Sequence, residues 1–175
     1  MAEKHGARPI GPIVSSAHLA DGAAPALSEV EFGLILSSHA FERWMVRCMT
    51  AAGEGGLTAT EILVLHTVTH RGKPKRLSDI CLVLGIEDTH LVTYAIKKLE
   101  AKGLVAREKA GNERLVQVTE AGQGACDRYR ELRERILVEG IAELGLPKER
   151  LSEIAHLLRL LSGHYDQAAR TAASL

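Results

Sequence analysis

Side chains that can hydrogen-bond to base edges and phosphates recur within residues 89–97. Threonine hydroxyls and an imidazole match the donors and acceptors of base edges, while a phenol and an ammonium suit phosphate oxygens. Leu91, Val92 and Ile96 recur at the spacing of a helix core face, which puts the polar side chains on the opposite side. The candidate contacts to DNA are Thr89, His90 and Thr93 for bases, and Tyr94 and Lys97 for phosphates.

Four more polar residues flank this segment where they could reach the sugar–phosphate backbone. Lys75, Arg76 and Ser78 stand at the start of a preceding short helix, and Arg114 follows in a polar turn. Cations and hydroxyls of this kind position a protein on a duplex without reading its sequence. The alternative interpretation is that these side chains only form the solvated face that any amphipathic helix presents.

The elements that must hold these residues are encoded in residues 77–103. Ser78 is a suitable N-cap for a short helix, and Gly85 can adopt the positive φ of a tight turn. A longer amphipathic helix then begins near Asp88 and ends at Gly103, where a C-terminal glycine belongs. The expected buried positions are Ile80, Leu82, Val83, Leu84, Ile86, Leu91, Val92, Ala95, Ile96 and Leu99.

Two β-prone runs follow, at residues 104–105 and 115–118, on either side of a polar turn. A short helix, a tight turn, a longer helix and a hairpin in this order predict a winged helix-turn-helix. In such a unit the second helix enters the DNA major groove, and the hairpin can reach the neighbouring backbone or minor groove. The sequence therefore predicts a DNA-binding regulator, with Arg114 in the wing.

Helices are also expected before this unit. The motif at residues 28–31, Ser-Glu-Val-Glu, predicts a capping box at Ser28 and a helix running to about Ala52. Thr58-Ala59-Thr60-Glu61 predicts a second capping box and helix. Residues 1–27 contain three prolines and are expected to form an irregular arm, apolar enough to lie on the body or on a partner subunit.

The chain after the hairpin is also expected to be helical. Thr119 is suited to cap a long helix from about Glu120 to Glu139, and Pro147 precedes a last helix. Because a winged helix has its own small core, the apolar face of the last helix has little left to cover within one chain. We therefore expect a homodimer; the alternative is that the terminal helices pack on their own winged helix. That apolar face comprises Leu151, Ile154, Leu157, Leu158, Leu161 and Tyr165.

Three segments follow one another along the chain: LTATEILVLHTV, LSDICLVLGIEDTHLVTYAIKKLEAKGLV and VQVTEAG. Over about residues 57–135 they resemble the multiple-antibiotic-resistance regulator (MarR) family, in the family's order. The resemblance implies a mainly α fold with a small β-hairpin wing, flanked by N- and C-terminal helices that interdigitate in a dimer. Thr89 and Tyr94 stand where the family often has arginine, and Asn112-Glu113-Arg114 only approximates its Asp-x-Arg wing tip.

This interpretation divides the chain into an arm (1–27), an N-terminal dimerisation helix (28–56), a winged helix (57–118) and C-terminal dimerisation helices (119–175). A two-fold dimer would bind double-stranded DNA at a near-palindromic site with half-sites about one helical turn apart. In the family, a small-molecule effector binds between the dimer helices and the winged helix and changes the DNA affinity. The candidate effector pocket is lined by Phe41, Trp44 and Met45.

Composition and charge are consistent with a cytoplasmic regulator. No basic-then-apolar leader follows Met1 and no run of about 18 apolar residues occurs, so neither secretion nor a membrane is expected. Three widely spaced cysteines, Cys48, Cys81 and Cys126, suggest a reducing compartment without disulfides. The formal net charge is zero, but residues 58–118 carry ten basic against seven acidic side chains. That local excess permits DNA binding without demanding it.

Other chemistry is less well supported by the sequence. His66 and His70 stand four apart on an expected helix and could share a metal, but ordinary helix histidines are favoured because no third ligand is fixed. Cys48 and Cys81 could sense redox state, although buried thiols are the simpler interpretation. The sequence has no Gly-rich phosphate loop, nucleophile elbow or paired carboxylates, so neither catalysis nor a cofactor is expected.

Two alternative functions remain open at this level. A winged-helix protein that binds other proteins and not specific DNA would fit the neutral charge and the apolar arm. A metal- or redox-sensing variant of the regulator would use the histidine pair or the cysteines.

Overall fold

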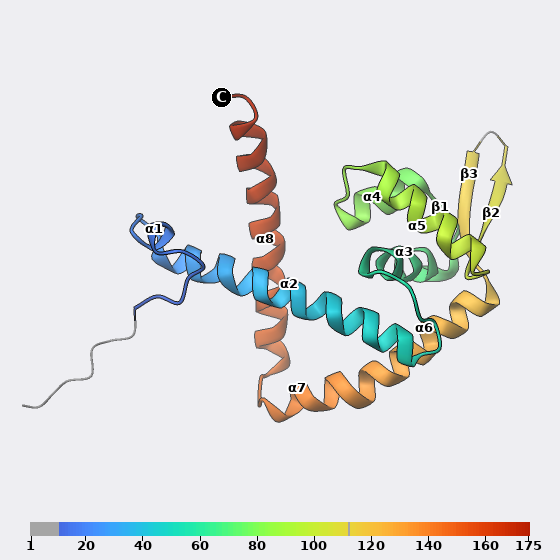
Figure 1. The fold of residues 1–175 in the computed structure, drawn as a ribbon, viewed down its shortest axis with the longest axis horizontal. Coiled ribbons are helices and arrows are strands. Elements are labelled where there is room, and N and C mark those ends of the chain that lie inside the picture. Colours follow the sequence, from blue (N-terminus) through green and yellow to red (C-terminus); the bar gives the residue numbers. More distant parts are fainter. Residues whose placement is uncertain (1–10, 112) are drawn as a thin grey trace, which may run out of the picture. The chain divides into compact units, whose positions relative to one another are not determined.

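A computed structural model describes residues 11–111 and 113–175 of the chain (Figure 1). The chain forms two compact units, the first ending at Tyr129 and the second running from Arg130 to Leu175. Among the described residues, no helix has both the length and the apolar character required to cross a membrane.

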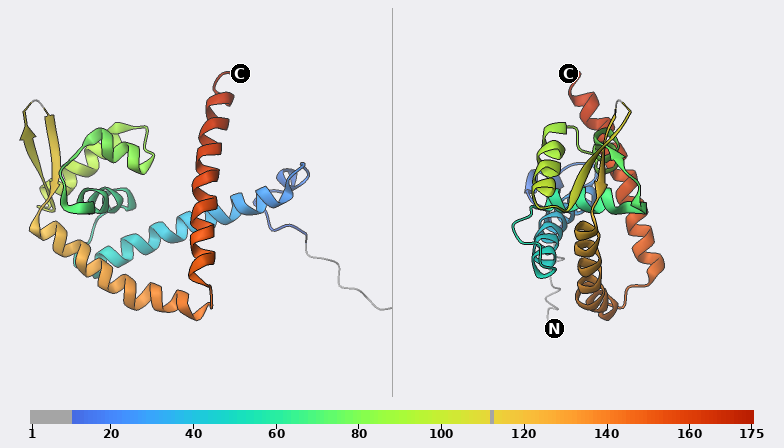
Figure 2. Two further views of the ribbon diagram at one scale, coloured as in Figure 1. Left: turned by 180° about the vertical axis from the view of Figure 1, so that it is seen from behind. Right: turned by 90° about the vertical axis from the view of Figure 1, so that its right-hand side faces the viewer.

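The first unit contains the expected winged helix. Helices α3 (Ala59–Thr69), α4 (Leu77–Leu84) and α5 (Thr89–Ala101) are followed by the hairpin of β2 (Val105–Ala110) and β3 (Glu113–Val118). The hairpin extends past the helices, as Figures 1 and 2 show. Strand β1 (Lys75–Arg76), which the sequence did not predict, pairs antiparallel with β3 and completes a sheet of order β1-β3-β2. The fold class predicted from the sequence is confirmed.

The helix ends follow from local chemistry. Thr58 and Glu61 form the predicted capping box of α3, with Thr58 N–H donating to Glu61 Oε2 at 2.7 Å. Gly85 and Gly103 take φ of 63° and 71°, the left-handed conformation that closes a helix. Asp88 is the N-cap of α5, which agrees with the helix start expected near this residue. The prediction for Ser78 is wrong: α4 begins at Leu77, two residues earlier than a Ser78 cap requires, so Ser78 lies inside its first turn and Arg76 occupies the N-cap position.

The core of this unit lies between α3, α5 and the base of the wing. Ile80, Val92, Ala95, Ile96 and Leu99 are buried as predicted. Three predicted core residues are instead exposed, namely Leu82 (82%), Val83 (68%) and Leu91 (54%). They occupy the outer sides of α4 and α5, because a short helix presents only one narrow face to the core. Other fully buried side chains include Met45, Met49, Ile62, Val64, Leu65, Val68, Leu104 and Val105.

The long helix α2 (Pro25–Ala51) precedes the winged helix, after the short α1 (Ala17–Ala20). The predicted capping box at Ser28 is wrong, because the helix starts at Pro25, which suits a first helical position. Ser28 is instead buried within α2, where its hydroxyl donates to Leu19 O at 2.7 Å. Residues 1–10 of the expected arm lie outside the described residues.

Helix α6 (Glu120–Leu132) leads from the first unit into the second. Thr119 caps it as predicted, accepting a hydrogen bond from Gly122 N–H at 3.1 Å. The second unit then contains a π-helical stretch η2 (Arg133–Val138), α7 (Glu139–Glu143) and α8 (Lys148–Ala172). The helical segment thus continues past the predicted end near Glu139 to Glu143, and Pro147 precedes α8 as expected.

Candidate nucleic-acid interface

The exposed side of α5 carries the polar residues identified from the sequence. Thr89, His90, Tyr94 and Lys97 are exposed, opposite the buried Val92, Ala95, Ile96 and Leu99. Thr93 is half-buried, and its hydroxyl donates to Thr89 O at 2.9 Å, leaving the oxygen lone pairs able to accept a further hydrogen bond. The structure brings these side chains to one helix surface; their contact with DNA stays a prediction.

The acidic start of α5 has a structural role. Asp88 Oδ1 accepts a hydrogen bond from His90 N–H at 2.9 Å, which satisfies one of the unpaired amides at the helix N-terminus. At the other end of the exposed face, the Lys97 ammonium lies 5.5 Å from the centre of the Tyr94 ring. This cation–π contact holds a positive charge on the outer surface of α5.

A groove joins α5 to the wing. It encloses about 140 Å³ and brings Thr93 of the helix beside Arg114 of β3. Arg107, from β2, also lines the groove, and its Nε lies 3.3 Å from Glu100 Oε2 at the C-terminal end of α5. The helix and the hairpin are thereby held together. The remaining lining residues are Leu77, Ile96, Leu115 and Val116.

Lys75, just before α4, makes hydrogen bonds within the protein that the sequence did not predict. The Lys75 ammonium donates to the carbonyl oxygens of Val68 (3.3 Å), His70 (2.6 Å) and Lys73 (3.0 Å). Burial, with a smaller effect from the charge of Arg71, lowers the pKa of Lys75. Lys75 therefore closes the end of α3, and its predicted contact with DNA would require it to leave these carbonyls. Ser78 is exposed in the first turn of α4.

Arg76 and Glu113 form a second fixed contact. Arg76 Nη2 lies 2.8 Å from Glu113 Oε1, and Arg76 Nε donates to Glu113 Oε2 at 2.9 Å. The pair links the start of α4 to the outer part of the wing. Sequence reasoning named Arg76 but not its partner, because the two residues are far apart in the chain and meet only when β1 pairs with β3.

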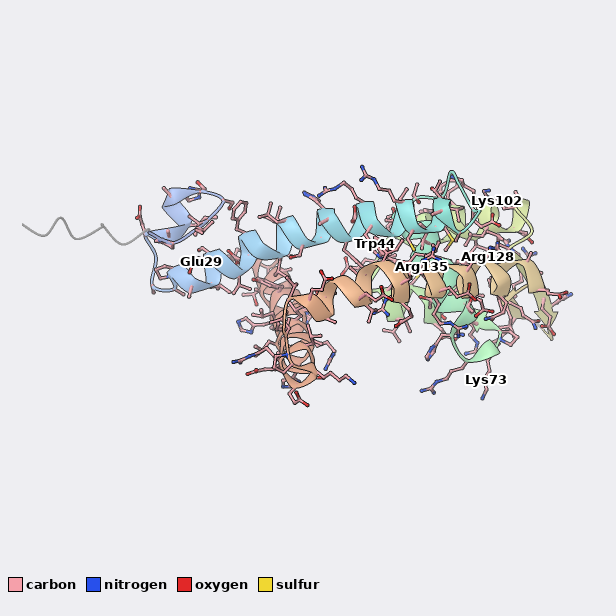
Figure 3. The ribbon with its side chains drawn as sticks, turned by 90° about the horizontal axis from the view of Figure 1, so that it is seen from below. Glu29, Trp44, Lys73, Lys102, Arg128 and Arg135 are labelled. Carbon is pink, nitrogen blue, oxygen red and sulfur yellow. The ribbon has the colours of Figure 1, made fainter. Side chains whose placement is uncertain are left out.

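Ion pairs also join the end of α2 to α5 and α6. Glu54, just after α2, lies 3.8 Å from Lys102 Nζ and 3.6 Å from Arg128 Nη2. Arg128 Nε also donates to Ala52 O at 2.7 Å. Figure 3 shows Lys102 and Arg128 near this end of α2, with Lys73 extending away from the helices. These contacts fix α2 and α6 against the winged helix.

The three residues predicted to line an effector pocket lie at different depths along α2. Met45 is buried, Trp44 is half-buried with its indole nitrogen enclosed and without a hydrogen-bond partner, and Phe41 is 52% exposed. The structure also has a hollow of about 330 Å³ over α3 and α4, which the sequence did not indicate. That hollow is lined by Leu63, His66, Thr67, His70, Lys75 and Val83.

His66 lines this hollow and is partly enclosed. Its ring contacts Tyr129 of α6 edge-on, at 4.7 Å between centres, and its Nε2 is buried without a hydrogen-bond partner. Burial lowers the pKa of His66. His70 lines the same hollow but lies just past α3, at the start of the 3-10 turn η1 (His70–Gly72). The two histidines therefore do not share one continuous α-helix, as the metal-pair interpretation assumed. Across the described residues, no group of three His, Cys, Asp or Glu could hold a metal ion.

All three cysteines are buried and free. Burial raises the pKa of the Cys48 thiol, which donates to Tyr129 O at 3.7 Å. Burial also raises the pKa of Cys126, partly offset by a hydrogen bond with Thr69. A raised pKa keeps a thiol protonated and poorly nucleophilic, so these two cysteines have the environment of packing residues.

Comparison with known proteins identifies the module and the fold. Residues 57–122 match the family described as winged helix DNA-binding domain. A search of the curated proteins found no matching sequence.

Solved structures of MarR-family regulators share the fold. A MarR family regulator from Neisseria meningitidis has a TM-score of 0.65, 18% identity, and covers 82% of this chain and 95% of its own. A mutant of MarR from E. coli, solved with operator DNA, has a TM-score of 0.64, 17% identity, and covers 81% and 99%. CouR from Rhodococcus jostii RHA1, bound to p-coumaroyl-CoA, has a TM-score of 0.61, 18% identity, and covers 83% and 95%. Residues 57–122 thus match the winged helix DNA-binding domain family, and the chain has the fold seen in structures of MarR-family transcriptional regulators.

Proposed function

We propose that the protein is a sequence-specific regulator of transcription that binds double-stranded DNA as a homodimer. The observation that carries this proposal is the groove shared by α5 and the wing, which brings Thr93 and Arg114 together. His90 is exposed three residues before Thr93 on the same helix. In a winged helix, these two elements contact the major groove and the adjacent backbone or minor groove. The similarity of fold to MarR solved with operator DNA supports the same use here.

Dimerisation is proposed from the exposed apolar surface of the helices outside the winged helix. In the second unit, Leu151, Ile154 and Leu157 are 39–50% exposed along one side of α8. In the first unit, Leu27, Val30, Ile35 and Leu36 are exposed on the N-terminal half of α2. A second copy of the chain would bury both surfaces in a two-fold interface. Two recognition helices would then meet a near-palindromic operator with half-sites about one helical turn apart.

The first experiment is to measure binding of the purified protein to genomic DNA fragments, including the region upstream of its own gene. Retention of one fragment at physiological salt would support specific regulation, whereas equal loss of all fragments would contradict it. His90→Ala should weaken binding to the retained fragment more than binding to other DNA. Arg150→Ala is the control, because Arg150 is an exposed residue of α8 paired with Glu153.

We further propose that a small effector regulates this binding from the hollow beside α3. The hollow offers an apolar lining, and His66 Nε2 is a buried hydrogen-bonding atom that a ligand could satisfy. An effector releases DNA only to the extent that it binds one state of the dimer more tightly than the other. His66→Phe should abolish the response of a retained operator complex to an active effector, while leaving DNA binding itself in place.

A second candidate function is a protein-binding module. The observation in its favour is the exposure of Leu82, Val83 and Leu91 on α4 and α5, apolar surface that a DNA phosphate would not cover. Leu82→Ser with Val83→Ser separates the two functions. Specific DNA binding that is retained in this variant supports the regulator. Absence of specific DNA binding by the wild-type protein, together with a protein partner that this variant loses, supports the module.

A further inference from the structure

We propose that the Glu113 carboxylate competes with DNA phosphate for the Arg76 guanidinium. Glu113 binds Arg76 in the unbound protein and releases it only in the specific complex with an operator. This inference rests on the proposed function of the winged helix as a DNA reader. It assigns a role in discriminating between DNA sequences to a residue that would not itself touch a base.

The contact is a two-pronged fork between side chains held by backbone pairing. Arg76 Nη2 and Nε face the two oxygens of Glu113 at 2.8 and 2.9 Å. Arg76 pairs with Leu115 across the β1–β3 ladder, and Glu113 precedes Leu115 by two residues on β3. Residues two apart point to the same face of a strand, so Glu113 is the diagonal neighbour of Arg76. The fork therefore follows from the sheet register.

A guanidinium binds a phosphate with the same geometry. Its planar N–H groups form two parallel hydrogen bonds to a carboxylate or to two phosphate oxygens. A phosphate can therefore replace the Glu113 carboxylate without a change in the Arg76 backbone, whose N–H donates to Asp79 Oδ2 at 3.4 Å. The Arg76 and Glu113 side chains are 57% and 49% exposed, so solvent screens the pair and the exchange is accessible.

Because of where the Arg76–Glu113 contact lies, replacement of the carboxylate by a phosphate depends on how the DNA is positioned on the protein. Arg76 precedes α4, and Glu113 is on the wing, so the fork spans the two parts of the module that approach the backbone. A phosphate fixed by a specific complex can satisfy both nitrogens. Loosely bound DNA presents phosphates at no fixed position, and it also meets the negative charge of Glu113. The carboxylate should therefore weaken non-specific binding more than specific binding.

The test compares Glu113→Gln with Glu108→Gln. Glu108 is an exposed glutamate on β2 of the same hairpin, with no ion pair to any residue that the structure describes. Binding is measured over a range of salt concentrations to a retained genomic fragment and to a duplex of scrambled sequence. On scrambled DNA, Glu113→Gln should raise affinity several-fold and steepen the slope of log K against log salt by about 0.9, the value for one added phosphate contact. On the specific fragment, the slope should stay unchanged, because Arg76 already binds a phosphate there.

Arg76→Gln supplies the second arm of the experiment. In that background, Glu113→Gln should have no larger effect than Glu108→Gln, because no guanidinium remains to be released. Equal effects of the two glutamate substitutions in the presence of Arg76, or an undiminished Glu113→Gln effect in its absence, would overturn the inference alone. Absence of DNA binding by the wild-type protein would overturn the proposed function together with it. Thermal melting of each variant shows that it is folded.

Discussion

Helix α6 packs closely against the backbone at the base of the wing, and Gly122→Ala is the substitution that tests this packing. A Cβ on Gly122 would overlap the Leu104 carbonyl oxygen and come within 2.9 Å of the Leu104 carbonyl carbon and 3.0 Å of Val118 Cγ2. The Leu104 carbonyl is held in place, since it accepts a hydrogen bond from Thr119 N–H at 3.1 Å. The neighbour is backbone, so the side chain cannot be accommodated by a rotamer change.

The magnitude follows from two opposing terms. Overpacking a close-packed site costs about 1–3 kcal/mol or more, while alanine in place of glycine inside a helix contributes about 1 kcal/mol in the other direction. With the clash against backbone at the upper end of that range, we expect Gly122→Ala to destabilise the protein by about 2 kcal/mol. For a chain of this size, that corresponds to a fall in Tm of roughly 4–8 °C.

The assay is thermal unfolding followed by circular dichroism, at one protein concentration because the Tm of the proposed dimer would depend on it. Gly124→Ala is the matched control, two residues along the same helix, where a Cβ would meet only Arg128 Nη1, the end of a flexible side chain, at 3.3 Å. We expect it to be neutral or to raise Tm by a few degrees, since it gains helix propensity at little steric cost. A Tm for Gly122→Ala equal to or above that of Gly124→Ala would refute the packing of α6 on the wing.

Three further predictions follow from single contacts. Thr58→Ala removes the hydroxyl that accepts a hydrogen bond from Glu61 N–H at 3.3 Å, and it should lower the free energy of unfolding, measured by chemical denaturation, by about 1 kcal/mol. Thr60→Ala should lower this free energy far less. Arg114→Ala should weaken DNA binding and flatten its salt dependence; an unchanged affinity and slope would remove the wing from the interface. Burial lowers the pKa of His66, so the unfolded chain binds a proton at this residue more readily than the folded chain. The contribution of His66 to the free energy of unfolding should therefore be fully present above about pH 6.5 and should be lost as the pH falls below that value. Denaturant midpoints between pH 7.5 and 5.5 should decline less in His66→Gln, and equal declines would contradict this assignment.

The predictable part of the fold was the part determined by local rules. The capping box at Thr58, the left-handed turn at Gly85 and the end of α5 at Gly103 each depend on a few adjacent residues. The order of helix, turn, helix and hairpin then fixed the module. Ser28 and Ser78 show the limit of the same rules, because both are good capping residues inside helices that start earlier. Helix α2 begins at Pro25 and α4 has Arg76 as its N-cap, and residue preferences alone do not predict which of several nearby residues begins a helix.

Tertiary contacts determined what the sequence did not reveal. Leu82, Val83 and Leu91 have the apolar character of core residues, yet the winged helix has no second layer to cover them. Strand β1 has two residues, too few for a period-two pattern, and forms only because β3 lies beside it. The roles of Lys75 and Glu113 depend on that strand. The candidate DNA surface was therefore identified by residue type, while the groove and the Arg76–Glu113 contact required the folded chain.

The net charge of zero is compatible with DNA binding because of where the acidic groups lie. Asp88 is committed to the N-terminus of α5, and three glutamates pair with cations of neighbouring elements: Glu54 with Lys102 (3.8 Å), Glu61 with Lys98 (3.0 Å) and Glu100 with Arg107 (3.3 Å). In each pair the carboxylate neutralises the charge of its partner cation. Salt screens the remaining electrostatic field of these groups beyond a Debye length of about 8 Å. Lys97 and Arg114 then act largely as local charges on α5 and the wing. Affinity should accordingly depend on a few phosphate contacts and on the fit of α5 in the groove, with a shallow salt dependence as the measurable consequence.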